Sequence, residues 1–408
     1  MSQPISRRLV IQASSTAAFV SAFMPSIAHG AEPIAVGTLT PNTGGGSPYG
    51  AGMATAIKRT ADQINAAGGL LGGRMIVLTQ EDSETNPETA VRAADKLINV
   101  NRVSAILGTW ASSVTLGIMP KCQAANVIQM CTSSSSDIPT RDLKQLCFNF
   151  QVLNPVWGRA LGQLALDQGL TTFNVMAPNN DFTISLVKGF VDLVGNGKLL
   201  EQPFYYNVNQ SSYRAEVSRL LEKNPQAVFV PGYVTDFTAV YKEIYRSGYK
   251  GRVITVSIAT DGPFKSAIGS AADGILHGIP IPPLDSPAYK QYLKEAKLED
   301  TGRIQDPYAT ACRDQMSVLA LAIEKAGSTD PERVKKAIFD VTTGPGKRTV
   351  YNALDGLRAL RAGEQINYSG AGSEVEFDKD RQLISRDVQL YEIKGGKDNI
   401  LSTLKFKG

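Results

Sequence analysis

The chain has few of the side chains from which catalytic and metal sites are usually built. Its 408 residues include only two histidines, His29 and His277. His29 falls in a segment that we expect to be removed, so a Ser-His-Asp triad or a zinc site would depend on His277 alone. We expect His277 to be structural, and the protein to be neither an enzyme nor a carrier of a metal or cofactor. An exported hydrolase using Ser112 or Cys131 is the least favoured alternative, because no GxSxG sequence is present.

The chain also lacks the charge and the motifs of a nucleic-acid or nucleotide binder. Its formal net charge is +4, and removal of Arg7 and Arg8 would leave +2 (4 − 2). A charge this small gives no electrostatic reason to expect nucleic acid as a partner. The glycine-rich segment 40–52 contains no GxGxxG sequence, and GxxxxGK[ST] occurs nowhere in the chain. We therefore expect no nucleotide at this loop.

Cysteines and long apolar runs are scarce as well. Four cysteines are present, and an even number permits disulfides in an exported protein. Cys131 with Cys147 is the pair that we favour, because each flanks a predicted strand of one subdomain. Reduced, buried cysteines remain the alternative, because export by the twin-arginine route follows folding. Beyond residue 30 no run approaches eighteen apolar residues, so we expect no transmembrane helix.

The first thirty residues have the pattern of an export signal. Arg7 and Arg8 precede a mildly apolar run, small residues follow near Ala28 and Gly30, and no Asp, Glu or Lys occurs before Glu32. This is the order of a charged region, an apolar region and a cleavage site. The paired arginines favour the twin-arginine route, and a membrane anchor would need a longer apolar run. We expect cleavage near residues 28–31 and a periplasmic protein.

Strand patterns alternate with helical patterns over most of the remaining chain. In the first half we expect strands at residues 33–39, 75–80 and 105–107, and helices at 53–66 and 87–99. A second series begins near Asn154 and continues to about residue 257. Such repetition with short connections predicts a parallel, doubly wound α/β sheet. The proline-rich residues 279–285 are interpreted as a linker back to the first domain, and a last strand is expected at 389–394.

Two successive predicted strands end in clusters of hydroxyl residues, at 109–115 and 132–136. In open α/β sheets, ligands bind outside the carboxyl ends of the strands. Hydroxyls and free backbone N–H groups can hold a small carboxylate without any lysine or arginine. The alternative is that these are ordinary turn and helix-cap residues.

Further polar and aromatic candidates follow other predicted strands. Tyr49 lies in the glycine-rich loop beside a predicted helix start, and Phe182, Tyr233 and Asp261 follow strands of the second series. Each has a plainer interpretation: Phe182 as a core residue, Tyr233 as a turn residue and Asp261 as a helix cap.

The chain resembles the periplasmic leucine/isoleucine/valine-binding protein family of ABC transporters over nearly its whole mature length. The resemblance is carried by the following segments: INAAGGLLGGRMIVLTQEDSETNP at 64–87, ILGTWASS at 106–113, TSSSSDIP at 132–139, DPYATACRDQMSVLALAIEKAG at 306–327 and INYSGAGSEVEFDKD at 366–380. It implies a type I periplasmic-binding fold, in which two doubly wound lobes are joined by three hinge crossovers. Lobe 1 would comprise residues 31–152 plus 280–374, and lobe 2 residues 153–279 plus 375–408, after a signal peptide at 1–30. The crossovers would fall near 151–154, 278–282 and 373–377.

The resemblance also implies a set of ligand-binding residues. The hydroxyl residues that would hold a carboxylate are Ser112, Ser113, Thr132 and Ser134. Aromatic walls would come from Tyr49, Trp110, Phe182 and Tyr233. Asp261 is the only acid near the family's ammonium-binding glutamate, about four residues out of register. Ser83 and Ala111 stand where the disulfide common in branched-chain amino-acid binders would have its cysteines.

The function implied is that of a monomeric, non-enzymatic capture protein. A branched-chain or related amino acid would bind between the lobes, hinge closure would cover it, and the closed form would dock on a membrane permease. An aromatic acid, an amide or urea in the same role, or service as a ligand sensor, remain alternatives.

Overall fold

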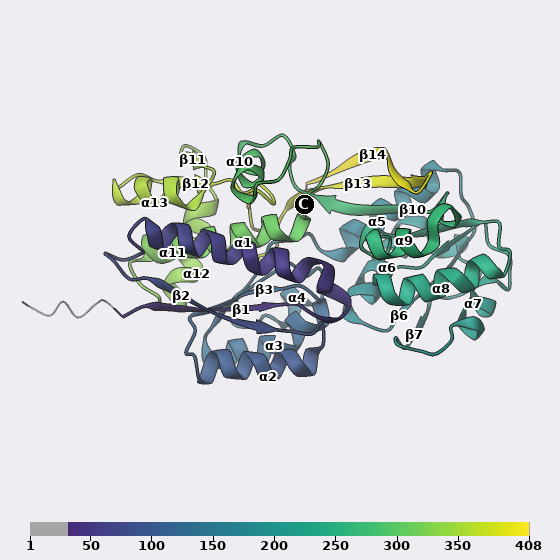
Figure 1. Cartoon of the computed structure of the whole chain (residues 1–408), viewed down its shortest axis with the longest axis horizontal. Coiled ribbons are helices and arrows are strands. Elements are labelled where there is room, and N and C mark those ends of the chain that lie inside the picture. The colour runs from purple at the N-terminus through teal and green to yellow at the C-terminus, as the bar shows by residue number, and fades with distance from the viewer. Residues whose placement is uncertain (1–31, 408) are drawn as a thin grey trace, which may run out of the picture. The chain divides into compact units, whose positions relative to one another are not determined.

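Parallel strands and the helices that connect them make up most of the protein. The structure, a computed structural model, describes residues 32–407. Five strands form a first sheet in the order β2 (Ile76–Asp82), β1 (Ile34–Thr40), β3 (Ala105–Thr109), β4 (Ile128–Cys131) and β5 (Cys147–Asn149), and all neighbouring pairs are parallel. We call this sheet and its helices lobe 1 (Figure 1).

Helices cover both faces of the first sheet. α1 (Ser47–Ala66) and α11 (Pro307–Ala326) lie on one side of it, and α2 (Pro87–Asn99) and α3 (Ser112–Ala125) on the other (Figure 1). α2 begins as the sequence indicates, because the Asn86 side chain accepts a hydrogen bond from the Thr89 N–H and Pro87 occupies the first helical position. Lobe 1 also contains α4 (Ile138–Arg141), α10 (Pro287–Ala296), α12 (Pro331–Thr342), α13 (Ala353–Arg361), the single turn η1 (Gly44–Gly46) and a two-stranded parallel sheet of β11 (Arg348–Val350) and β12 (Ile366–Tyr368).

Lobe 2 is built on a seven-stranded sheet. Its order is β14 (Lys397–Lys407), β13 (Ser385–Lys394), β10 (Leu276–Ile281), β9 (Arg252–Val256), β8 (Ala227–Phe229), β6 (Phe173–Pro178) and β7 (Phe204–Tyr206). The strands from β10 to β7 are parallel, whereas β13 and β14 add an antiparallel edge. Its helices are α5 (Asn154–Asp167), α6 (Asp181–Val194), α7 (Arg214–Leu221), α8 (Val234–Arg246) and α9 (Gly262–Ile268), with single turns η2 (Asn196–Lys198), η3 (Ser257–Ala259) and η4 (Gly269–Ala272).

The predicted fold class is confirmed: the chain is α/β, with two doubly wound parallel sheets. It passes between the sheets after β5, after β10 and after β12. The described residues, 32–407, form one compact unit, so the boundaries proposed for the two lobes stay a prediction. The export signal lies outside the described residues. Among residues 32–407, none of the helices combines the length and the apolar composition that a bilayer span requires.

One predicted linker is wrong in its first part. Residues 279–281 complete strand β10 instead of leaving the sheet. β9 pairs with β10 only as far as Gly278, so Pro280 lies where β10 has no neighbour on that side. On its other side, β10 continues to pair with β13. A proline without an N–H is tolerated at such a strand edge.

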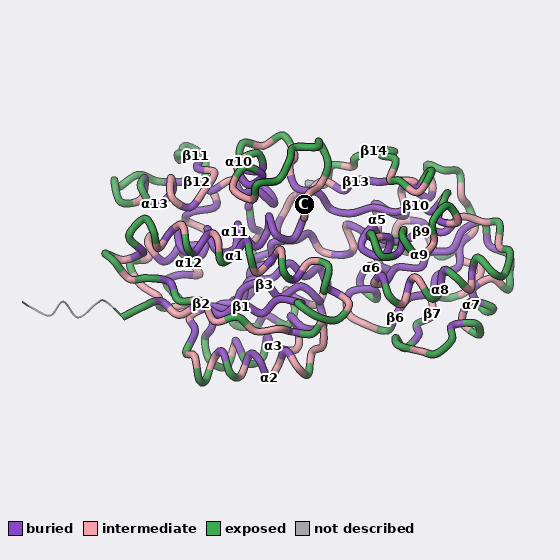
Figure 2. Tube along the Cα trace, in the orientation of Figure 1, coloured by how far each residue is buried: buried purple, intermediate pink, exposed green. Residues whose placement is uncertain are grey.

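The core of lobe 1 is organised around α11. Every residue of α11 from Pro307 to Ile323 is buried, and the fully buried strand β3 packs against it (Figure 2). A helix buried all round must satisfy any charge that it carries. Arg313 and Asp314 are two such charges, 3% and 0% exposed.

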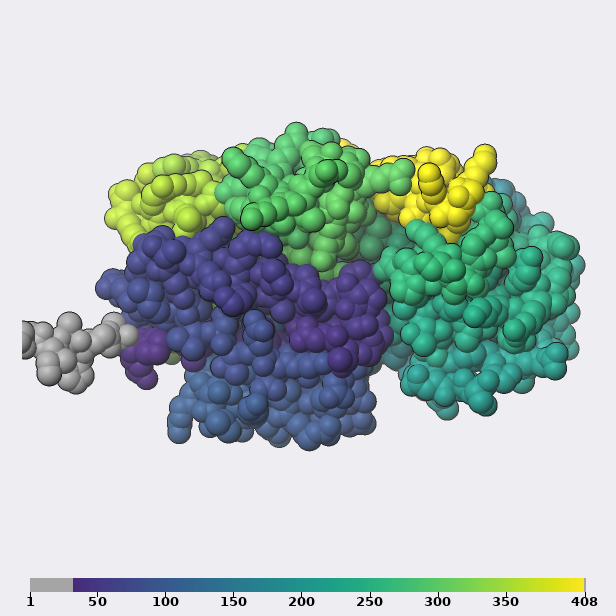
Figure 3. Space-filling model, viewed as in Figure 1, coloured from purple at the N-terminus to yellow at the C-terminus, as the bar shows by residue number. Residues whose placement is uncertain are grey.

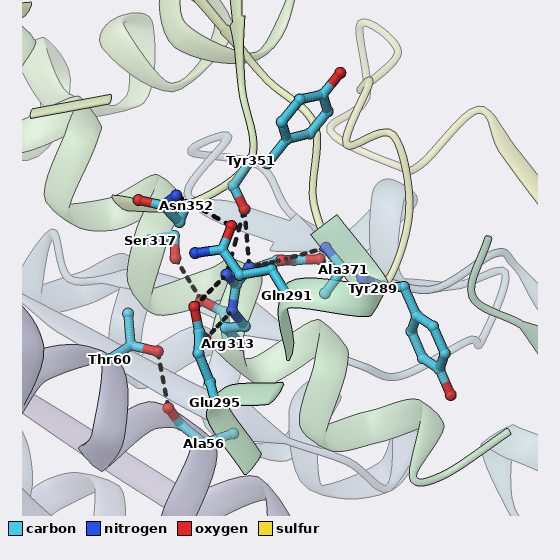
Figure 4. A network of polar contacts seen from close by, with 12 residues as sticks. Ala56, Thr60, Tyr289, Gln291, Glu295, Arg313, Ser317, Tyr351, Asn352 and Ala371 are labelled. Atoms are coloured by element: carbon cyan, nitrogen blue, oxygen red, sulfur yellow. Dashed lines mark hydrogen bonds and ion pairs between the residues drawn. The ribbon is translucent and has the colours of Figure 1, made fainter. Parts of the chain in front are cut away.

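Each of these two charges has several partners. Arg313 donates two hydrogen bonds to Glu295, at 2.9 and 3.1 Å, and others to the Tyr351 carbonyl (Figure 4). Asp314 accepts from the Tyr368 hydroxyl and from the N–H groups of Ala371 and Gly372, at 2.8, 2.9 and 2.6 Å. The carboxylate of α11 therefore holds the chain that follows β12 on its way to lobe 2.

Candidate ligand-binding site

The two hydroxyl clusters lie side by side, as the parallel arrangement of β3 and β4 predicts. The Thr132 N–H donates to the Thr109 carbonyl at 2.9 Å, and the Ser134 N–H donates to the Ser112 hydroxyl at 3.4 Å. The Ser133 hydroxyl, in turn, donates to the Trp110 carbonyl at 3.0 Å. We call residues 109–115 and 132–136 the hydroxyl loops.

The first hydroxyl loop leads directly into a helix N-terminus. α3 begins at Ser112, and its N-cap residue, Ala111, makes no side-chain capping bond. The first N–H groups of a helix carry partial positive charge and suit an anion. Ser112, Thr132 and Ser134 are buried and Ser113 is half-buried. This arrangement can hold a carboxylate through hydroxyl and N–H donors.

Aromatic rings form a continuous series from lobe 1 to lobe 2 in front of these loops. The centroid of Trp110 lies 5.6 Å from that of Tyr49 and 5.1 Å from that of Tyr233, whose ring stacks on Phe182 at 5.6 Å. Tyr308, at the start of α11, packs on Tyr49 at 4.9 Å and on Trp110 at 5.7 Å. Trp110 and Phe182 are only 6% and 7% exposed, so the rings fill the space between them.

Backbone contacts join the second hydroxyl loop to lobe 2. The Ser136 N–H donates to the Ser185 hydroxyl of α6 at 3.0 Å, and the Asn154 N–H donates to the Ser134 carbonyl at 2.6 Å. The Asn154 amide also donates to the Phe182 carbonyl at 2.7 Å. In Figure 3 the surface of the N-terminal segment of lobe 1 meets that of lobe 2. The lobes are therefore in contact at the predicted site.

A cavity of about 330 Å³ lies beside this aromatic series. It is lined by Pro48, Tyr49, Ser257, Asp261, Ile279, Arg303, Ile304, Asp306, Pro307, Tyr391 and Asp398. Of the residues predicted from the sequence, Tyr49 and Asp261 line it. Trp110, Phe182, Tyr233 and the residues of the hydroxyl loops are not among its lining residues. The predicted site thus divides into two parts that share Tyr49.

Asp261 is the acid that lobe 2 contributes to this cavity. It precedes α9 and makes no side-chain capping bond there. Burial raises the pKa of its carboxyl to about 7, against the lowering effect of Lys265 and with help from the charges of Asp398 and Asp306. Asp261 therefore lines the cavity, and its part in ligand binding stays a prediction.

Asp306 also lines the cavity, and it is not among the residues predicted from the sequence. Its side chain accepts hydrogen bonds from the Tyr308 and Ala309 N–H groups, at 3.2 and 2.9 Å, and so caps α11. Burial raises the pKa of its carboxyl to about 6 even though these two bonds act to lower it. Asp-Pro before a helical pattern predicts a helix cap. The sequence pattern does not show whether the capping side chain also lines a cavity.

His277 is buried, and both of its ring nitrogens lie next to polar partners. Its Nδ1 lies 2.8 Å from the Ser257 hydroxyl and its Nε2 lies 3.0 Å from Asp398, which also pairs with Lys265 at 2.6 Å. Tyr391 stacks on the imidazole, with the ring centroids 5.1 Å apart. Burial lowers the pKa of His277. Burial acts to raise the pKa of Asp398, but His277 and Lys265 outweigh it and lower that pKa to about 2.

The predicted disulfide between Cys131 and Cys147 is wrong. All four cysteines are free and buried, and the two sulfurs lie 3.9 Å apart in a hydrogen-bond contact. A disulfide requires about 2.05 Å. The residues sit on neighbouring parallel strands two positions out of register, since Gln129 pairs with Cys147 and Cys131 with Asn149. The alternative of reduced, buried cysteines describes this structure.

Comparison with known proteins assigns the chain to a family. The model of the periplasmic binding protein family matches residues 33–398, so the chain belongs to that family. A leucine-, isoleucine-, valine-, threonine- and alanine-binding protein of Pseudomonas aeruginosa is 24% identical over 341 residues, which cover 80% of this chain and 89% of the relative. The resemblance described from the sequence is confirmed.

Solved structures of low identity share the fold. The leucine-binding protein LivK of Thermotoga maritima superposes with a TM-score of 0.76 at 20% identity, covering 91% of this chain and 98% of its own. A solute-binding protein of an ABC transporter from R. palustris, solved in complex with benzoate, reaches 0.73 at 18% identity, covering 92% and 97%. The type I periplasmic binding protein fold is therefore established for this chain.

Proposed function

We propose that this protein is the extracytoplasmic solute-binding component of an ABC importer and that it captures a small carboxylate-bearing ligand, in the first place a branched-chain or related amino acid. The observation that carries the proposal is the meeting of the two hydroxyl loops at the uncapped N-terminus of α3, in contact with lobe 2. Donors without a fixed positive charge suit a carboxylate that must also be released.

Capture proceeds by hinge closure. The ligand's carboxylate binds Ser112, Thr132 and Ser134 on lobe 1 while the lobes are apart, and closure brings Tyr233 and Phe182 over it and excludes water. Trp110 now contacts Tyr233, so a bound ligand replaces ring–ring contacts by ring–ligand contacts. A ligand shifts the equilibrium only through contacts that it makes better in the closed form. The closed form then docks on a membrane permease in the periplasm.

An aromatic acid is the second candidate ligand. The rings of Tyr49, Trp110, Tyr233, Phe182 and Tyr308 form a wall suited to another ring. The similarity to a benzoate-binding protein of the same fold supports this candidate. An amide or urea is a further candidate ligand for the same cleft. A protein that senses its ligand, in place of delivering it to a transporter, would bind it in this cleft as well.

The test is a thermal-shift screen of the mature chain followed by calorimetry. The panel holds branched-chain and aromatic amino acids, benzoates, short amides and urea. A ligand at a hundred times its dissociation constant adds about 2.7 kcal/mol of stability. We expect a carboxylate to raise the melting midpoint and Ser112→Ala to weaken its binding about tenfold, since one hydrogen bond to a charged group contributes about 1.5 kcal/mol or more.

The matched control is Ser218→Ala, which removes an exposed hydroxyl of α7 on lobe 2. It should bind like the unaltered protein. A panel in which no carboxylate shifts the midpoint, or a Ser112→Ala variant with unchanged affinity, would overturn the proposal.

A further inference from the structure

One buried arginine lies where the chain crosses between the lobes. Arg386 is at the start of β13, the strand that follows the last crossing from lobe 1, and it is 4% exposed. Its guanidinium donates only to oxygen atoms of neutral groups. The acceptors are the Ile281 carbonyl at 3.2 Å, the Phe150 carbonyl at 3.2 Å, the Gln151 side chain at 3.0 Å and the Pro307 carbonyl at 3.3 Å.

These acceptors belong to both lobes. Phe150 is fixed to lobe 1, because its N–H donates to the Cys131 carbonyl of β4 at 2.8 Å. Pro307, the first residue of α11, belongs to lobe 1 as well. Ile281 is the last residue of β10 and pairs with β13, so it belongs to the sheet of lobe 2. Arg386 therefore joins lobe 1 directly to the sheet of lobe 2.

The three crossings of the chain meet around this side chain. The first leaves β5 through residues 150–151, the second leaves β10 at Ile281, and the third reaches β13 just before Arg386. The first and third also contact one another, since the Asn149 side chain donates to the Gln382 side chain at 2.9 Å. Hinges between domains are formed by a few residues at the ends of strands and helices. Arg386 thus contacts every segment that must turn when the lobes open or close.

A charge buried in this way is costly, and here no ion pair offsets the cost. The other two buried arginines of residues 32–407 each pair with a carboxylate, Arg313 with Glu295 at 2.9 Å and Arg381 with Asp142 at 3.2 Å. Arg386 has no such partner within the described part of the chain, and burial lowers its pKa to about 10. An apolar side chain would avoid this cost, but only a guanidinium presents five N–H donors in a rigid, planar fork. The carbonyls that it holds in fixed directions therefore explain this side chain.

We propose that Arg386 ties the three crossings into one hinge unit, so that the lobes open and close by a single rotation and Tyr233 returns to the hydroxyl loops whenever they meet. The inference rests on the hinge closure of the proposed function, although its test needs no ligand. Without the guanidinium, the segments at Phe150, Pro307 and Ile281 turn independently, and the open protein samples several arrangements of the lobes. A ligand must then restrict these arrangements as well, at a cost in entropy. Arg386 is thus a positioning residue.

The experiment measures the distance between two spin labels, one on each lobe, by pulsed electron paramagnetic resonance of the unliganded protein. The labels are attached to Thr55→Cys on α1 and Ala239→Cys on α8, two exposed positions on the helices that begin beside Tyr49 and Tyr233. The four native cysteines are buried, so the introduced thiols should react selectively. With Arg386 present, a single rotation between open and closed forms should give one or two narrow maxima. Arg386→Met should broaden each maximum.

Arg386→Lys is the second variant, because it keeps the positive charge and most of the side-chain volume and should fold even if Arg386→Met does not. Its ammonium presents three donors from a single nitrogen and does not reach acceptors in as many directions, so the maxima should broaden here too. The matched control is Leu97→Ala, which removes a fully buried side chain of α2 within lobe 1. It destabilises the protein by leaving a cavity, but it should leave the maxima narrow.

The inference would be overturned if the maxima of both arginine variants were as narrow as those of the protein that keeps Arg386, or if they moved without broadening. Equal broadening in Leu97→Ala would overturn it as well, because lost stability would then account for the effect. If Arg386→Met does not fold, Arg386→Lys alone decides. The proposed function fails separately, in the thermal-shift screen, if no carboxylate binds.

Discussion

Replacing Asp306 by asparagine should stabilise the unliganded protein in a pH-dependent way. Burial raises the pKa of the Asp306 carboxyl from 3.8 to about 6. Because the folded state then binds the proton more tightly than the unfolded chain, folding stability is lost as the pH rises from about 4 to about 6, and the loss is complete above that range. Asparagine carries no such proton, so the variant should not show this loss.

The size of the effect follows from the pKa shift. It is roughly two pKa units, and at about 1.4 kcal/mol per unit it corresponds to at most about 3 kcal/mol. Solvent reaching the half-buried carboxyl reduces this figure, so we expect a gain of about 2 kcal/mol at pH 8 and almost none at pH 4. The cap of α11 should survive, because the asparagine carbonyl can still accept from the Tyr308 and Ala309 N–H groups.

The assay is urea denaturation of both proteins at pH 4, 6 and 8. The titratable groups that feel the charge of Asp306 are Tyr289, Tyr292, Tyr308, Cys312 and Asp261, and only Asp261 titrates within this range. It is present in both proteins, so most of its contribution cancels in the difference. A stability difference that is independent of pH, or a variant that is less stable at pH 8, would refute the reasoning.

Three further predictions concern the two lobes and the core. Tyr233→Ala should weaken ligand binding about as much as Ser112→Ala, because closure needs contacts on both lobes; an unchanged affinity in calorimetry would argue against hinge capture. Asp314→Ala should destabilise the chain by about 3 kcal/mol or more in urea denaturation, because it leaves Arg313 and the N–H groups of Ala371 and Gly372 without one of their partners. An exposed substitution such as Asp62→Ala should cost well under 1 kcal/mol. The thiols should resist an aromatic disulfide reagent in the native protein and react, four per chain, in denaturant; an oxidised pair would give two.

The alternation of strand and helix patterns was sufficient to predict the fold. Buried strands ending in turn residues place β3 and β4 next to one another, and the parallel arrangement then brings Ser112 and Ser134 together. This reasoning needs only the spacing of apolar residues along the sequence and the rule that ligands bind at the carboxyl ends of strands. It succeeded because both loops follow neighbouring strands of one sheet.

The remainder of the site depends on contacts between segments that are distant in sequence. Asp306 and Tyr308 enter it because α11 packs along α1, and no local pattern distinguishes such a cap from an ordinary one. The edge strand β14 was missed for another reason. Its residues 397–406 are largely exposed, so they lack the clear alternation of a half-buried strand. The linker prediction failed at residues 279–281 because proline usually ends a strand. The sequence does not show that β10 has no neighbouring strand on one side at Pro280, where a proline is tolerated.

The Ser257, His277 and Asp398 side chains lie in the order of a catalytic triad, yet their environment argues for an electrostatic role. A general base must gain a proton during the reaction. Burial lowers the pKa of His277, which is 1% exposed, and so opposes that gain. Lys265 further holds Asp398 in a fixed ion pair, and the ionised Asp398 in turn raises the pKa of Asp261. The row of hydrogen bonds thus fixes one negative charge, that of Asp398, in the cavity wall that Asp261 also lines.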